Sequence, residues 1–148
     1  MFELGNDKEF TLIGTDEQQT PPDLDEAGPG TVAVMSQRLY RENGYFVPGE
    51  QVGWVFGTAV VEHFRWAVCD LTFLLDGTGG QLEMVQEDEG EQRPDDRDRL
   101  TVHGAVPIKD RTLGAGTLVV TGGSGNMKGS LHTVYLETRN PKRWSFLP

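Results

Sequence analysis

The sequence has little cysteine, little positive charge and no long hydrophobic run. Its one cysteine, Cys69, has no partner for an intrachain disulfide, which favours a reducing compartment. Lys and Arg total 13 against 23 Asp and Glu, and the net charge of −10 disfavours nucleic acid and anionic membranes as partners. No apolar run approaches the ~18 residues of a membrane span, and the first residues lack the pattern of a signal peptide. The 148 residues therefore predict a soluble, cytoplasmic protein with one folded domain.

Helical periodicity is also missing, because no segment of ten or more residues carries an apolar face at helical spacing. Short segments rich in β-branched and aromatic residues alternate instead with turns rich in Gly, Pro and Asn. Many of the 19 glycines stand in or beside these segments, which favours a strongly curled barrel over a flat sandwich. The sequence predicts an all-β fold, an eight-stranded antiparallel β-barrel over residues 31–148. Its expected strands are 31–41, 53–62, 65–75, 81–87, 99–106, 116–121, 128–138 and 143–147.

Residues 1–30 differ from the rest of the chain in charge. They contain eight acidic residues and one basic residue, and so carry most of the net negative charge. Residues 18–30 show no periodic apolar face and predict a linker. Two interpretations stay open for residues 1–30, a loosely held tail or a lid over the barrel mouth. Phe10, Leu12 and Ile13 would give a lid apolar side chains to bury.

Sequence motifs for metal, phosphate or covalent chemistry are weak. Residues 122–125, Gly-Gly-Ser-Gly, lack the Lys-Ser/Thr ending and following helix of a phosphate-binding loop, so they predict a tight hairpin. His63, His103, His132 and Cys69 do not have the spacing of metal ligands. No Gly-x-Ser-x-Gly motif occurs. We expect neither a metal nor a cofactor.

Three segments together resemble a known family. Residues 117–129, Thr-Leu-Val-Val-Thr-Gly-Gly-Ser-Gly-Asn-Met-Lys-Gly, resemble the Thr-Gly-Gly-Ser/Thr-Gly-x-[Phe/Tyr]-x-Gly block of allene oxide cyclases and dirigent proteins. Residues 100–104 and 51–57 resemble two further strand elements of that family, and residues 38–143 follow it in order. Met127 stands where the family usually has an aromatic residue.

Within this family, the plant branches fit less well, because the chain lacks a signal peptide and a second cysteine. It is more similar in character to the bacterial spirotetronate and spirotetramate cyclases of polyketide pathways, which catalyse intramolecular [4+2] cycloadditions. The resemblance implies an eight-stranded barrel that works without a cofactor as a homodimer, on a hydrophobic, polyketide-derived intermediate. Such catalysis would come from folding the substrate, worth up to ~7–11 kcal/mol, and from a hydrogen bond to a carbonyl of the dienophile.

Strand alternation and the resemblance together nominate site residues. On the first expected strand, we take Ala33, Met35, Gln37 and Leu39 as the inward set. The catalytic candidates are Gln37, Glu83 and His103. An inward Glu83 would have a raised pKa and could donate a proton, whereas the alternative register turns it to water. The alternative interpretation of His103 is that it lies at a strand edge or faces solvent, with no catalytic role. The substrate-binding candidates are Met35, Leu39, Val85, Leu118, Val134, Leu136 and Thr138.

Three other functions remain open from the sequence. The same barrel could close a ring by epoxide opening or proton transfer, as allene oxide cyclases do. It could bind a hydrophobic small molecule without catalysis. It could also be a structural dimer with no ligand.

Overall fold

The computed structural model describes residues 9–75, 98–124, 131–138 and 141–148. The predicted all-β class is confirmed, because the described residues form strands and two short 3-10 turns, with no α-helix. The two turns are η1 (Leu24–Glu26) and η2 (His63–Arg65). The strands are β1 (Phe10–Thr20), β2 (Val32–Glu42), β3 (Pro48–Glu62), β4 (Trp66–Leu75), β5 (Asp98–Lys109), β6 (Thr112–Leu113), β7 (Gly116–Ser124), β8 (Thr133–Thr138) and β9 (Lys142–Leu147).

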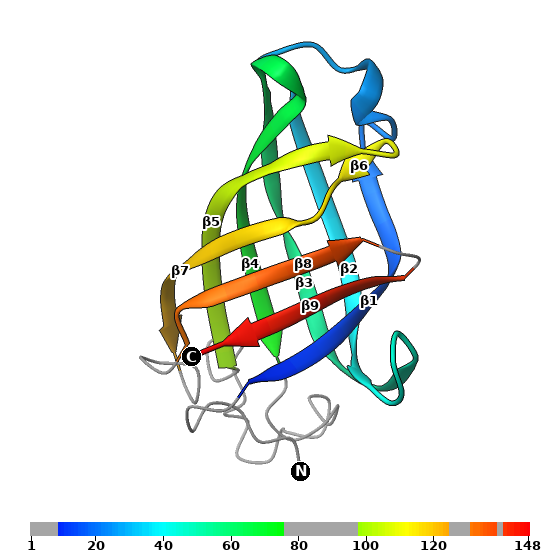
Figure 1. The fold of residues 1–148 in the computed structure, drawn as a ribbon, viewed down its shortest axis with the longest axis vertical. Helices are drawn as coiled ribbons and strands as arrows, with labels where there is room; N and C mark the ends of the chain where they lie inside the picture. The colour runs from blue at the N-terminus through cyan, green and yellow to red at the C-terminus, as the bar shows by residue number, and fades with distance from the viewer. Residues whose placement is uncertain (1–8, 76–97, 125–130, 139–140) are drawn as a thin grey trace, which may run out of the picture.

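The sheet closes on itself as an antiparallel barrel. Its order is β4-β3-β2-β1-β9-β8-β7-β5, and pairing of β4 with β5 joins the two ends. Eight long strands therefore make the wall in the part of the chain that the structure describes, and the two-residue β6 pairs with β5 alone. Figure 1 shows β7, β8 and β9 crossing in front of β2, β3 and β4, with β5 at the left side of the barrel and β1 at the right.

The start of the barrel differs from the expectation. Residues 10–20, assigned to the acidic extension, form β1, which lies between β2 and β9. Leu12 is fully buried, and Phe10 stacks on Phe146 with ring centroids 4.6 Å apart. The expected strand 81–87 lies outside the described residues, and so do Glu83 and Val85. The apolar first half of β1 is buried in the barrel wall, and its polar second half is exposed. The sequence of this exposed half therefore resembles a linker.

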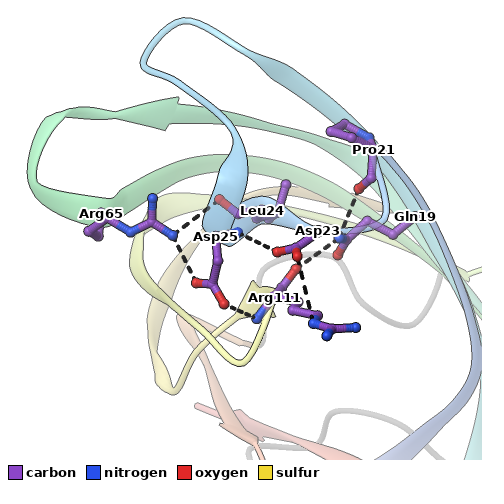
Figure 2. Close-up of polar contacts among 7 residues, drawn as sticks. All are labelled: Gln19, Pro21, Asp23, Leu24, Asp25, Arg65 and Arg111. Atoms are coloured by element: carbon purple, nitrogen blue, oxygen red, sulfur yellow. Dashed lines mark hydrogen bonds and ion pairs between the residues drawn. The ribbon is translucent and has the colours of Figure 1, made fainter.

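The connection from β1 to β2 covers one end of the barrel. Leu24 of η1 is fully buried in the core, and its amide donates to the carbonyl of Arg111 over 2.9 Å. The Asp25 carboxylate accepts from Nη2 of Arg65 at 2.8 Å and from the amide of Arg111 at 3.0 Å (Figure 2). Residues beyond β1 thus lie over a barrel end. A lid function for them stays a prediction.

The interior of the barrel is filled by side chains. Ala33, Met35, Gln37 and Leu39 are all buried, as alternation predicts for this strand. Phe73 of β4 packs edge-on against Trp144 and Phe146 of β9, with centroid distances of 5.2 and 5.0 Å. Among the described residues, no helix is long and apolar enough to cross a bilayer.

Two expected boundaries also shift. Gly122, Gly123 and Ser124 continue β7 and pair with β5, so these three residues are strand rather than hairpin. The rest of that motif, residues 125–129, lies outside the described residues. In the strand expected at 128–138, the described residues are regular from Thr133 onward.

Candidate functional site: a polar cleft beside β1

A cleft of about 470 Å³ opens in the barrel wall between β1, the β5–β6 turn and the ends of β8 and β9. In Figure 1 these elements meet at the right-hand side of the barrel, below β6. The volume lies within the range of small-molecule sites, ~300–1,000 Å³. Most of the residues that line it are polar or charged, and the lining includes Gly14, Glu17, Gln37, Thr112, Thr138 and Lys142. A neighbouring hollow of about 280 Å³ continues past Gln19 and Arg111.

A β-bulge in β1 shapes one wall of this cleft. The pairing of β1 with β2 shifts between Thr15 and Gln18, and Asp16 adopts a left-handed φ of 57°. A bulge inserts an extra residue and re-aims the side chains near it. Here Glu17 reaches Lys142 of β9 and Thr112 of β6, neither of which is its ladder partner.

Lys142 is a buried cation in the cleft wall. Its side chain is 8 % exposed, and Nζ donates to Glu17 Oε2 and to Thr112 Oγ1, both at 2.9 Å. Burial lowers the pKa of Lys142 below its ordinary value, while the charge and hydrogen bond of Glu17 act in the opposite direction. The cleft therefore contains an acid–base pair whose amine loses its proton more readily than a surface lysine does.

Gln37 supplies a second polar group to the same cleft. It is 5 % exposed, and Trp144 Nε1 donates to its Oε1 over 3.1 Å. Because an indole N–H can only donate, this bond fixes which end of the amide faces Trp144. The Nε2 group has no hydrogen-bond partner among the described residues. Gln37 thus offers an oriented N–H donor to a ligand oxygen.

Gly14 makes room for that amide. A Cβ atom at residue 14 would overlap Gln37 Oε1 and would lie 2.9 Å from Trp144 Nε1. We expect Gly14→Ala to displace Gln37 and lower the free energy of unfolding by about 1–3 kcal/mol, measured by urea denaturation. Gly28→Ala is the matched control, since no atom lies within 4 Å of the added Cβ, and it should change stability by less than about 0.5 kcal/mol. Equal stability of the two variants would contradict this geometry.

The sequence-predicted residues separate into two groups around the cleft. Gln37 and Thr138 line it. Met35 lines a void of only about 10 Å³ inside the barrel, room for about one water. The other described candidates are fully buried core residues that do not line the cleft: Leu39, Leu118, Val134 and Leu136. These four side chains belong to the packed core cluster of the described residues, and a substrate-binding role for them stays a prediction.

His103, the third catalytic candidate, lies on the outer wall of the barrel and does not face the interior. Its side chain is 51 % exposed, and Nδ1 lies 2.7 Å from Oδ1 of Asp70 on the neighbouring strand. Its strand neighbour Val102 is buried, and alternation then turns His103 outward. This is the solvent-facing alternative left open by the sequence.

Sequence reasoning missed Glu17, Thr112 and Lys142. Glu17 lay in a segment taken for a linker, and Lys142 follows Asn140-Pro141 as an ordinary surface charge would. One signal was available, because Lys142 shares strand parity with Trp144 and Phe146, both buried. That parity predicts an inward lysine.

Comparison with known proteins supports the fold. A solved structure named "Pyocyanin demethylase" superposes with a TM-score of 0.59 over 94 % of this chain and 98 % of that one, at 17 % identity. At this identity the likeness establishes the barrel fold alone. No protein-family model matches the sequence, and no curated protein matches it. The allene oxide cyclase resemblance thus has no support from a sequence match.

Proposed function

We propose that the protein is a cofactor-independent cyclase of the allene oxide cyclase-like type. It acts on a linear, polyketide-derived intermediate and closes a ring by intramolecular [4+2] cycloaddition. The barrel, the motif resemblance and a cleft of suitable size support this proposal. Because the core packs tightly, the intermediate binds in the cleft beside β1 rather than among the core residues.

The unpartnered Nε2 of Gln37 is the observation that carries the proposal. A cycloaddition of this type needs no nucleophile, but it is accelerated by a hydrogen bond to the carbonyl of the dienophile. Gln37 is held by Trp144 with its donor free in the cleft. The rest of the rate comes from holding the flexible chain in a reactive conformer.

The direct test is turnover of a linear tetronate or tetramate carrying a diene and a dienophile, followed by chromatography with mass detection. We expect Gln37→Leu to lower kcat/KM by about 10- to 100-fold, because one hydrogen bond to the reacting carbonyl is lost. Gln18→Leu is the control, since it removes an exposed amide from β1 away from the cleft lining. No turnover of either substrate class by the wild-type protein would refute the proposed reaction.

The Lys142–Glu17 pair favours a second candidate, ring closure by proton transfer. A loss of ~10⁴-fold on changing one polar residue would indicate general acid–base catalysis and favour this reaction. Tight binding of the intermediate without turnover would indicate a binding protein instead. A homodimer and a cytoplasmic location stay predictions from the sequence.

A further inference from the structure

We propose that Lys142 forms an imine with small aldehydes or ketones that enter the cleft. The inference uses the cleft of the proposed function and names a second class of ligand for it, but it does not depend on the cycloaddition. It rests on a chain of hydrogen bonds that fixes the amine.

That chain begins at Gln19. Its Nε2 donates to the carbonyls of Pro21 and Arg111, both at 3.0 Å, so its Oε1 must face Thr112 (Figure 2 shows Gln19, Pro21 and Arg111). Thr112 Oγ1 lies 2.7 Å from Gln19 Oε1 and 3.0 Å from Glu17 Oε2, so its single proton goes to one of these two acceptors. The hydroxyl oxygen then accepts from Lys142 Nζ.

The same two contacts remain available to Lys142 after it loses a proton. A neutral amine has two N–H groups and one lone pair. The two N–H groups of Lys142 would bond Glu17 Oε2 and Thr112 Oγ1, and Nζ has no third partner among the described residues. Its lone pair is then unengaged, as nucleophilic attack on a carbonyl carbon requires.

The surroundings of Lys142 set how readily it loses its proton. Glu17 of β1 raises the pKa of the amine, and so does Cys69 of β4, but burial lowers it more. Asp16, Lys109 and Asp110 also line the cleft. Glu17 is therefore the acid that contacts the amine directly.

The covalent step balances within the site. The Nζ lone pair attacks the carbonyl carbon, and the carbonyl oxygen, which Gln37 Nε2 can hydrogen-bond, becomes a hydroxyl as Glu17 carries one proton to it from nitrogen, giving a carbinolamine. Glu17 then carries the second nitrogen proton to that hydroxyl, which leaves as water. One C=N bond and one water replace the C=O bond and two N–H bonds, with no change in oxidation state.

The test traps the imine in the full-length protein. Incubation with butyraldehyde and cyanoborohydride at pH 7, followed by peptide mapping by mass spectrometry, reports the butyl adduct on each lysine. We expect Lys142 to be labelled about tenfold faster than Lys109, an exposed lysine that also lines the cleft. Lys142→Met, checked for folding by circular dichroism, should lack that adduct. Labelling of Lys142 no faster than Lys109 would overturn the proposal.

A second variant tests whether Glu17 controls the protonation of Lys142 or only forms a structural ion pair with it. Glu17→Gln removes the negative charge that favours the protonated amine, so the pH midpoint for labelling of Lys142 should fall. An unchanged midpoint would count against the assigned acid–base pair and the proposal. Labelling without turnover of tetronates or tetramates would refute the cyclase and leave the imine site standing, whereas turnover without labelling would do the reverse.

Discussion

A chain that begins after Gly28 is expected not to fold. The deletion removes β1, which pairs with β2 on one side and β9 on the other. It also removes Leu12 and Leu24, which are both fully buried. Truncating a core leucine to alanine typically lowers the free energy of unfolding by about 2–5 kcal/mol. Together with the loss of two ladders, this is comparable to the whole ~5–15 kcal/mol that stabilises a domain. Circular dichroism should show loss of the sheet, and light scattering should show aggregation through the exposed edges of β2 and β9.

A shorter deletion is the control for this result. Removing residues 1–8 ends before Phe10 and leaves every described strand in place, so the barrel signal and the melting temperature should persist. Leu12→Ala in the full chain should lower the free energy of unfolding by about 2–5 kcal/mol. A folded barrel from residues 29–148 would show that β1 is dispensable and would restore the interpretation of residues 1–30 as an extension.

The fold class was predictable because β-strand alternation and glycine-rich turns are local signals. Alternation also placed Gln37 and Met35 on the inner face of β2, where both are buried. Alternation did not predict β1, because the bulge at Asp16 interrupts the alternating pattern. The acidic second half of this strand also resembles a linker in composition. Composition averaged over residues 1–30 hid a strand that pairs on both sides.

The site was less predictable because it depends on contacts between distant residues. Glu17 and Lys142 are 125 positions apart, and no local pattern joins them. Cavity size depends on how neighbouring side chains fill the barrel, so apolar residues at inward positions do not show whether a space remains. Leu118 and Leu136 illustrate this, since both point inward and end in a packed core.

A second large effect is expected at Arg143 of β9, the strand that pairs with β1. Its Nε and Nη2 donate to the two oxygens of Glu42 at 2.6 and 3.0 Å, and Nη1 donates to Glu137 at 2.6 Å. Thr11 of β1 also donates to Glu42 over 2.6 Å. The bidentate pair therefore links the end of β2 to β9 across β1, with both side chains mostly buried.

Replacing this arginine should be costly. We expect Arg143→Met to lower the free energy of unfolding by about 2–3 kcal/mol in urea at pH 7, because Glu42 keeps its charge and loses its strongest partner. Arg38→Met is the matched control. Its Nε lies 4.0 Å from Asp16 in an exposed pair, so the loss should stay below about 1 kcal/mol.

The pH dependence gives an independent measure of the same contact. The hydrogen bond from Arg143 is the main cause that lowers the pKa of Glu42 from 4.5 to about 2. A carboxyl group with a lowered pKa stabilises the fold above pH 4.5, and this contribution is lost as the pH falls from 4.5 towards 2. The stability advantage of the wild type over Arg143→Met should therefore shrink across that interval in urea titrations. A difference that stays constant from pH 6 to pH 2 would show that Arg143 stabilises the barrel by packing, over Tyr45 and Phe46, rather than by its charge.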